Sequence, residues 1–296
     1  MYGISGDSRK CLAAAVSCRV DSEKVQEHRA PVNARGKNVA GSVSTIILRI
    51  SVQPPGRNAR NPVSHTGRSS KPAPAVNCAR KSMDHILVYA DSLTWGIVPN
   101  TRKRLTFDER WPGVLENKLN ASSRRVRVIE DCLNGRRTVW EDPFKPGRNG
   151  RSGLAQRIEI HSPLSLVILM LGTNDFQFAH PYNDAWSAAQ GVAALVNEMR
   201  QAPIEPGMPV PPVLIVCPPK IRTPQGSIAA KFRGAEQRCA GLADAYMRTA
   251  SDLQCAFFDA ETVTTASVID GVHLDLDQHA KLGNALAEIV RPFLTT

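Results

Sequence analysis

Short apolar runs alternate with stretches of helical periodicity along the chain from residue 83 onward. The runs have the length of buried strands, and the clearest is LVILML at 166–171. In 183–201 the apolar residues instead recur near every third or fourth position, which is typical of a helix packed on one face. The predicted strands are 86–90, 125–129, 166–171, 213–216 and 256–258, and the predicted helices are 111–119, 183–201, 229–253 and 278–290.

Strands that are apolar on both faces and alternate with helices are typical of a parallel sheet covered on both sides. The pattern therefore predicts an α/β domain, a three-layer α/β/α sandwich with a roughly five-stranded parallel sheet. In such sheets ligands bind beyond the carboxyl ends of the strands, so functional residues are expected where the strands end.

Residues 1–82 differ from the rest in charge and in pattern. They contain fourteen Lys and Arg against four Asp and Glu, whereas residues 83–296 contain twenty-three of each, so the net charge of +10 belongs to the first segment. Residues 51–76 are rich in Pro, Arg, Ser and Asn and hold too few large apolar side chains to offset the entropy cost of ordering. We predict that 1–82 is a basic extension, disordered or loosely attached, and that 83–296 is the compact domain.

The basic segment has two interpretations. It is either an upstream extension without a role in the chemistry, or a basic arm for nucleic acid or another anionic surface. Tyr2 is its only Phe, Trp or Tyr residue. This lack of aromatic residues among the basic ones disfavours nucleic acid as a partner.

The cysteines and the N-terminus bear on location and on cofactors. The seven cysteines include no CxxC pair, and an odd number fits a disulfide framework poorly, so free thiols in a reducing compartment are expected. Charged residues at 7, 9 and 10 precede any apolar run, unlike a secretory signal, and no stretch approaches the roughly 20 residues of a membrane span. We predict a cytoplasmic protein without membrane contact, metal or other cofactor.

Four short polar motifs stand where predicted strands end or, in the last case, just before the final helix. In chain order they are Ala90-Asp91-Ser92-Leu93, Asn134-Gly135, Gly172-Thr173-Asn174-Asp175 and Asp270-Gly271-Val272-His273. Each alone is weak evidence, because serine is a common helix cap and Asn, Gly and Asp are standard turn residues. Together they contain every group that serine ester hydrolysis requires.

The catalytic roles follow from residue type and spacing. Ser92, at a strand-to-helix turn, is the candidate nucleophile, and His273 is the candidate base. An Asp three residues before a His can meet its Nδ1 and leave the other ring nitrogen for the serine proton, which makes Asp270 the candidate orienting residue. His279, the nearest rival base, falls inside the predicted helix. The alternatives are a helix-capping serine and an ordinary surface histidine.

Three groups are candidate donors to an oxyanion: the backbone N–H groups of Ser92 and Gly135, and the side-chain amide of Asn174. Glycine permits close approach of the backbone, and an Asn directly after a strand can present its amide to the same point. The alternative for both motifs is an ordinary turn. Because no GxSxG motif occurs, the usual α/β-hydrolase arrangement is not supported.

On these residues the chain resembles the SGNH (GDSL) hydrolase superfamily, which is named for a serine, glycine, asparagine and histidine in four blocks. The resemblance implies a flavodoxin-like fold and assigns the four named residues, together with the acid of the triad, to Ser92, Gly135, Asn174, His273 and Asp270. The stretches 91–96, 110–111 and 170–175 are closer to the bacterial arylesterase and acetylesterase branch. The resemblance runs from residue 84 to the C-terminus and leaves out 1–82.

Two features depart from the superfamily pattern. Ala90 stands where the first block usually has glycine, and two arginines, Arg136 and Arg137, follow the glycine of the second block. Arg136 is one of four candidates for the substrate pocket, for which core packing or a solvated loop position is the alternative. These candidates are Asp91, Trp95, Arg136 and Phe176.

The resemblance implies a serine esterase that acts on small ester substrates with short acyl groups, acetyl above all, with aryl esters included. A carbohydrate O-deacetylase on the same scaffold is the alternative, and members of the branch include enzymes with perhydrolase activity. The resemblance also implies self-association into a homo-oligomer. A hydrolase fold that has lost catalysis is disfavoured, because the full set of catalytic groups is present.

Overall fold

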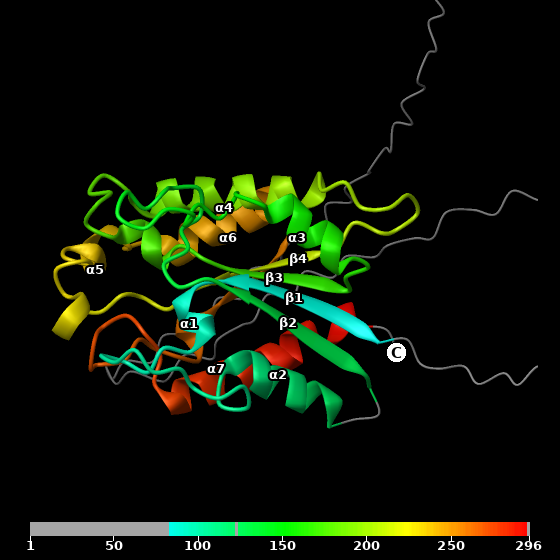
Figure 1. Ribbon diagram of the computed structural model, residues 1–296, viewed down its shortest axis with the longest axis horizontal. Helices are drawn as coiled ribbons and strands as arrows, with labels where there is room; N and C mark the ends of the chain where they lie inside the picture. Colours follow the sequence, from blue (N-terminus) through cyan, green and yellow to red (C-terminus); the bar gives the residue numbers. More distant parts are fainter. Residues whose placement is uncertain (1–82, 122–123, 295–296) are drawn as a thin grey trace, which may run out of the picture. The chain divides into compact units, whose positions relative to one another are not determined.

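A single five-stranded parallel sheet forms the centre of the computed structural model, which describes residues 83–121 and 124–294. The strands lie in the order β2-β1-β3-β4-β5 (Figure 1). Their bounds are β1 Asp84–Ala90, β2 Val126–Cys132, β3 Leu166–Met170, β4 Val213–Cys217 and β5 Ala256–Asp259. The predictions for 1–82 lie outside the described residues.

Helices cover both faces of the sheet (Figure 1). Helices α2 and α7 pack together on one face, and α3, α4 and α6 lie on the other. Their bounds are α2 Trp111–Asn120, α3 Leu154–His161, α4 Ala185–Arg200, α6 Leu242–Asp252 and α7 Leu276–Val290. The predicted three-layer α/β/α sandwich is confirmed.

Burial on both faces explains why the strands read as apolar runs. Every residue of β3 and β4 is buried, and the inner strand β1 leaves only His85 partly exposed. The outer strand β2 is mixed, with Arg127 exposed between buried valines. Each large apolar side chain removed from water at these positions contributes about 1.5 to 3 kcal/mol, so the inner strands carry much of the core.

The register brings three strand ends to one level at the carboxyl edge of the sheet. Ala90, the last residue of β1, pairs with Cys132 on β2 and with Met170 on β3. The segments that begin at Asp91, Leu133 and Leu171 therefore leave the sheet side by side. These segments hold the first three polar motifs of the sequence.

The long helix predicted over 229–253 is wrong in extent. The chain there forms a short helix, α5 (Ala235–Arg238), and then α6, with turns before each. Gly234 and Gly241 precede the two helices with φ of +73° and +79°, a conformation that does not continue a right-handed helix. The alanine content of the segment favours helix, but the two glycines divide it.

Five shorter elements lie in the connections. They are the one-turn helix α1 (Ser92–Trp95) and four 3-10 turns, η1 (Thr173–Phe176), η2 (Gly226–Ile228), η3 (Ala260–Thr262) and η4 (Arg291–Phe293). Of these, α1 and η1 directly follow strands β1 and β3 at the edge where the polar motifs gather.

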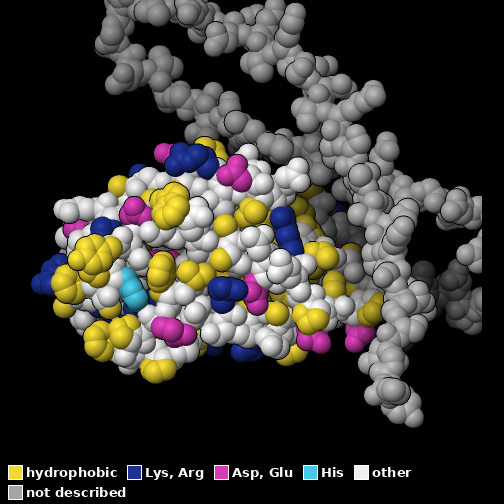
Figure 2. All heavy atoms as spheres, turned by 90° about the horizontal axis from the view of Figure 1, so that it is seen from above, with side chains coloured by type: hydrophobic (Ala, Val, Ile, Leu, Met, Phe, Trp, Pro, Cys, Tyr) yellow, Lys and Arg dark blue, Asp and Glu magenta, His cyan; other side chains and the backbone are white. Residues whose placement is uncertain are grey.

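The surface of the described domain carries charges of both signs. On the face seen in Figure 2, Lys and Arg side chains are interspersed with Asp and Glu, without a broad field of one sign. This agrees with equal numbers of acidic and basic residues in 83–296. In 83–121 and 124–294 no helix is long and apolar enough to cross a membrane.

Candidate active site

The turn from β1 into α1 places Ser92 at the carboxyl edge of the sheet. Asp91 caps α1 by accepting the Leu93 N–H through its side chain at 2.9 Å, and Gly96 ends the helix with φ of +83°. Ser92 is the first helical residue and is only 5% exposed. The short helix thus fixes the serine hydroxyl in a sheltered position.

Ser92, His273 and Asp270 form a continuous chain of contacts. Nε2 of His273 lies 3.2 Å from Oγ of Ser92, and Nδ1 of His273 lies 2.7 Å from Oδ2 of Asp270. With the Nδ1 proton held by the carboxylate, Nε2 is left to accept the serine proton. The structure therefore brings together three residues that are up to 181 positions apart in the chain.

Asp270 is held by its own loop as well as by the imidazole. Its Oδ1 accepts the N–H groups of Val272 and His273, each at 2.9 Å, and its Oδ2 also accepts the N–H of Asn100 at 3.1 Å. Burial favours the neutral form, but the hydrogen bond and charge of His273 and the two backbone donors outweigh it and lower the pKa of Asp270 to about 2. The carboxylate is therefore charged at neutral pH.

The rival histidine has a different environment. His279 lies on α7, is fully buried, and accepts the backbone N–H of Trp111 through Nδ1 at 3.3 Å. Burial, together with the nearby charges of Arg110 and His273, lowers the pKa of His279 to about 4, so this side chain is neutral. The His279 side chain thus joins α7 to the start of α2, whereas His273 contacts the serine hydroxyl.

Asn174, on the η1 turn after β3, is fixed from two sides. Its Nδ2 donates to Oδ2 of Asp91 at 2.8 Å, and its Oδ1 accepts Nε2 of Gln177 at 2.6 Å. Together these bonds determine which end of the amide is the nitrogen. One hydrogen of Nδ2 is engaged by Asp91, and the other is available for a ligand.

Gly135 lies in a tight turn that follows β2. The Arg136 N–H donates to the Leu133 carbonyl at 2.9 Å, and Gly135 has φ of +86°, which favours glycine. Within the described residues, neither the Gly135 N–H nor the Ser92 N–H donates to a protein acceptor. Both are therefore able to bind an oxyanion, together with the Asn174 amide.

A second layer of buried polar contacts ties these turns to one another. Asp175 accepts both the N–H of Thr138, at 2.9 Å, and the Thr138 hydroxyl. Burial raises the pKa of Asp175 to about 7 and that of Asp91 to about 6, although hydrogen bonds from Thr138, Leu93 and Asn174 oppose the shifts. The segment after β3 is thereby joined to the loop after β2.

The four pocket candidates differ in their surroundings. Asp91 is buried against Leu93 and Asn174, and Phe176 is fully buried in the hydrophobic core. Trp95 is half-buried at the end of α1, with the Arg104 guanidinium 4.6 Å from its ring centre. Core packing, the alternative left open by the sequence, accounts for Phe176.

Arg136 lies beneath the loop that carries Gly135. It is 5% exposed, and its guanidinium donates to the carbonyls of Ala90 and Asp131 and to the Asp131 carboxylate. The same group lies 3.9 Å from the ring centre of Tyr89. These contacts give Arg136 a role in fastening the loop to the end of β1, where Ala90 replaces the usual glycine.

Several functional contacts were missed by sequence reasoning. Gln177, which holds Asn174, itself accepts Nη2 of the fully buried Arg137 at 2.7 Å. Asn100, which donates to Asp270, has φ of +54°, and the preceding Pro99 signals a turn. The turn was predictable from the sequence, but its contact with Asp270 was not.

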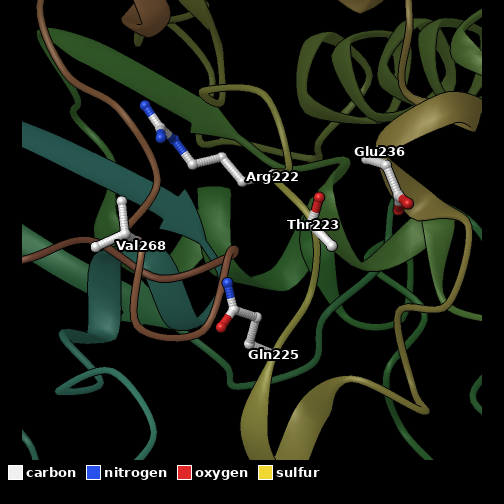
Figure 3. A pocket seen from close by; sticks show the side chains of 5 residues that line it. All are labelled: Arg222, Thr223, Gln225, Glu236 and Val268. Carbon is white, nitrogen blue, oxygen red and sulfur yellow. The ribbon is translucent and has the colours of Figure 1, made fainter.

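A hollow lies beside the segment that carries Asp270 (Figure 3). The backbone N–H of Arg222 donates to the Gly271 carbonyl, and that of Gln225 donates to the Asp270 carbonyl, which places the hollow next to this loop. Its lining is mainly polar and consists of Arg222, Thr223, Gln225, Glu236 and Val268.

The described part of the chain also lacks a cluster of metal ligands. In 83–121 and 124–294 no group of three or more His, Cys, Asp or Glu side chains is arranged to hold a metal ion. The four cysteines of these ranges, Cys132, Cys217, Cys239 and Cys255, are free thiols. The absence of a cofactor stays a prediction.

Residues 91–281 match the GDSL-like lipase/acylhydrolase family. This match spans more than half of the chain, and the chain belongs to that family. It begins at Asp91 and ends beyond His273, so it includes the last three polar motifs and all of the first except Ala90. No curated protein matches the chain.

Solved structures of esterases are similar to the domain. The native aryl esterase of M. smegmatis is 38% identical, with a TM-score of 0.67 over 71% of this chain and 100% of that one. A carbohydrate acetylesterase family member from Sinorhizobium meliloti is 36% identical, with a TM-score of 0.67 over 71% of this chain and 99% of that one. Est24, a carbohydrate acetylesterase from the same organism, is 30% identical over 71% of this chain and 100% of that one. This chain is thus an esterase or acylhydrolase of the GDSL family.

Proposed function

We propose that this protein is a serine esterase that hydrolyses short-chain acyl esters, acetyl esters above all. The observation that carries the proposal is the chain of contacts from Ser92 through His273 to Asp270. A serine hydroxyl is a weak nucleophile at neutral pH and requires an adjacent, oriented base. His273 is that base, and the charged Asp270 stabilises the imidazolium that forms during attack.

Catalysis proceeds by two acyl transfers. Oγ of Ser92 attacks the ester carbonyl carbon while its proton passes to Nε2 of His273. The tetrahedral intermediate collapses, the alcohol leaves with the proton from His273, and the acyl group stays on the serine. Water then attacks the acyl-enzyme with His273 again as base, and release of the carboxylic acid restores the Ser92 hydroxyl.

The oxyanion of each tetrahedral intermediate is bound by three donors. These are the N–H groups of Ser92 and Gly135 and the free Nδ2 hydrogen of Asn174. Support comes from the two unpaired backbone N–H groups and from the fixed amide of Asn174. Donors that are already in place do not need to reorganise when charge develops, which is why such sites lower the barrier.

Aryl esters are the preferred substrate class in this proposal, because the similar M. smegmatis protein is an aryl esterase. A carbohydrate O-deacetylase is the second candidate. It is favoured by the polar hollow beside the Asp270 loop, whose Arg, Thr, Gln and Glu side chains suit the hydroxyl groups of a sugar. Two similar structures are described as carbohydrate acetylesterases.

The test of the proposed function is hydrolysis of p-nitrophenyl acetate by the wild type and by Ser92→Ala, with folding matched by circular dichroism. We expect turnover in the wild type and a loss of several orders of magnitude in the variant. An inactive wild type, or a variant as active as its parent, would refute the proposal. A panel of aryl acetates and acetylated sugars, compared by kcat/KM, then separates the two substrate classes.

Two further properties follow from the same proposal. Hydrogen peroxide can replace water in the second acyl transfer and yield a peracid, so peracid formation at the expense of acid would establish perhydrolase activity.

We also propose a homo-oligomer, supported by the exposed aromatic side chains Phe144, Tyr182 and Trp186. Sedimentation equilibrium of the full chain tests this, and a purely monomeric protein would refute it.

A further inference from the structure

The turn after β2 contains one peptide group that matters for catalysis, the group between Asn134 and Gly135. In a trans peptide the C=O and N–H lie on opposite sides. The direction of the Asn134 carbonyl therefore determines the direction of the Gly135 N–H. Anything that holds this carbonyl also aims the oxyanion donor.

The backbone alone does not fix this peptide. The Arg136 N–H closes the turn on the Leu133 carbonyl, and the positive φ is confined to Gly135, which defines a type II turn. A type I turn has the same closing hydrogen bond. It differs from type II by about 150° in ψ of the second residue and by about 170° in φ of the third. The central peptide is therefore rotated by roughly half a turn, with its C=O and N–H pointing in the opposite directions. Glycine at the third position tolerates both.

Arg148 holds the central peptide in its present orientation. Its Nε donates to the Asn134 carbonyl at 3.0 Å, and its Nη1 donates to the Pro146 carbonyl at 3.0 Å. A Cβ added at Gly135 would lie 3.9 Å from Cδ and Nε of Arg148, so the arginine stem runs alongside the glycine. The side chain reaches this turn from fourteen positions further along the chain.

The backbone of Arg148 is itself anchored. Its carbonyl accepts the Arg137 N–H at 2.8 Å, and the Arg137 carbonyl accepts the Gly150 N–H at 3.1 Å. Arg137 and Asn149 thereby form a parallel bridge. The half-buried Arg148 side chain therefore extends onto the turn from an anchored backbone.

We propose that Arg148 is a positioning residue for the oxyanion hole. Its Nε–H bond to the Asn134 carbonyl selects the type II turn and so presents the Gly135 N–H to the oxyanion. The positive charge beside the carbonyl oxygen also polarises the peptide and makes its N–H a stronger donor. This inference rests on the proposed function, because it requires an oxyanion at that place.

Two substitutions separate the hydrogen bond from the bulk of the side chain. Arg148→Gln places its Nε2 the same number of bonds from Cα as the arginine Nε, so it can still donate to Asn134. Arg148→Met has a similar length but no donor. Arg151→Met is the control, because it removes a guanidinium three residues away whose ion pair, with Glu198, is exposed.

The measurement is kcat and KM for p-nitrophenyl acetate, with the inhibition constant of phenylboronic acid, which forms a tetrahedral adduct on an active-site serine. For Arg148→Met we expect kcat to fall about 10- to 100-fold with KM within about twofold, since an oxyanion donor is misaligned and ground-state binding is not. The boronate inhibition constant should rise with the loss in kcat/KM. Arg148→Gln should recover most of the activity, and Arg151→Met should match the wild type.

The proposal fails if Arg148→Met keeps the wild-type kcat and boronate affinity. It also fails if the Gln and Met variants lose activity equally, since the Nε–H bond would then not be the cause. Should Arg148→Met not fold, Arg148→Ala takes its place against Arg148→Gln. An inactive wild type, or an active Ser92→Ala, refutes the proposed function instead, so the two failures are distinguishable.

Discussion

Two loops at the carboxyl edge of the sheet supply the site, and they are held in different ways. The loop that carries Asp270 and His273 is stabilised mainly from within. The Ser267 N–H donates to the His273 carbonyl, the Gly271 N–H donates to the Ser267 carbonyl, and Asp270 accepts the N–H groups of the two residues that follow Gly271. All of these bonds span fewer than eight residues.

The loop that carries Gly135 depends on side chains from elsewhere. Thr138 is bound by Asp175, 37 positions away, and Arg137 is bound by Gln177, 40 positions away. The turn itself is held by Arg148. The base and its acid are thus held mostly by bonds within their own segment, with Asn100 adding a distant contact, whereas the turn of the Gly135 donor is held by side chains from elsewhere in the chain.

The largest effect is expected from a substitution in the loop that carries Asp270 and His273. Asp270→Asn keeps the size of the side chain but removes the charge and turns an N–H₂ group toward backbone donors or toward the imidazole. We expect kcat for p-nitrophenyl acetate to fall by about 10³- to 10⁴-fold, because the imidazole loses its correct tautomer and its counter-charge. Steady-state kinetics at matched folding measure this, and a loss below tenfold would contradict the role of Asp270.

A smaller effect is expected from substitution of Gln177, which links Asn174 to Arg137 of the Gly135 loop. Gln177→Leu removes the donor that holds Oδ1 of Asn174 and the acceptor of Arg137. We expect kcat to fall about tenfold, since the Asn174 amide keeps only its bond to Asp91 and is less well aligned. The control is Gln156→Leu, on the exposed face of α3. Equal kcat values for the two variants would show that Gln177 does not align the donor.

The buried carboxyls predict how stability depends on pH. The pKa of Asp175 is raised to about 7 in the folded protein, against about 4 when unfolded, so the folded state binds the proton more tightly between these values. Its stabilising contribution is therefore complete below about pH 4 and is lost as the pH rises toward about 7. Asp91, with a pKa of about 6, acts in the same direction.

Urea unfolding at a series of pH values between these limits tests this expectation. Asp175→Asn does not titrate, so its free energy of unfolding should fall less than that of the wild type as the pH rises. A variant with the same pH dependence as the wild type would mean that Asp175 is already charged in the folded state.

The smallest effect is expected from removal of residues 1–82. The described residues alone contain the proposed triad and the three proposed oxyanion donors. A chain that begins at Met83 should therefore keep kcat/KM within about twofold, as measured with p-nitrophenyl acetate. A large loss would refute the prediction that 83–296 is the complete catalytic domain.

The same contrast explains what the sequence could predict. Strands such as β3 were predictable because burial on both faces leaves an unbroken apolar run, and the contact between the candidate residues Asp270 and His273 was predictable because they are close in sequence. The division of 229–253 was missed because its alanines outweighed Gly234 and Gly241. Helix α3 was missed because only Leu154 and Ile158 are buried on its short length.

The supporting residues were missed for a different reason. Asn100 donates to Asp270 across 170 positions, and Gln177 and Arg148 are ordinary polar residues whose roles depend on what lies opposite them in the fold. Hydrophobic pattern and motif spacing carry no information about such pairings. The cytoplasmic location stays a prediction.

The most direct test of the central claim is covalent labelling of the nucleophile. The full chain is treated with diethyl p-nitrophenyl phosphate, and the intact mass and the modified peptide are determined by mass spectrometry. The account predicts one diethylphosphoryl group per chain, on Ser92, with loss of p-nitrophenyl acetate hydrolysis in the same proportion and no labelling of Ser92→Ala. Labelling of Ser92→Ala to the same extent, or full activity of the labelled protein, would contradict it.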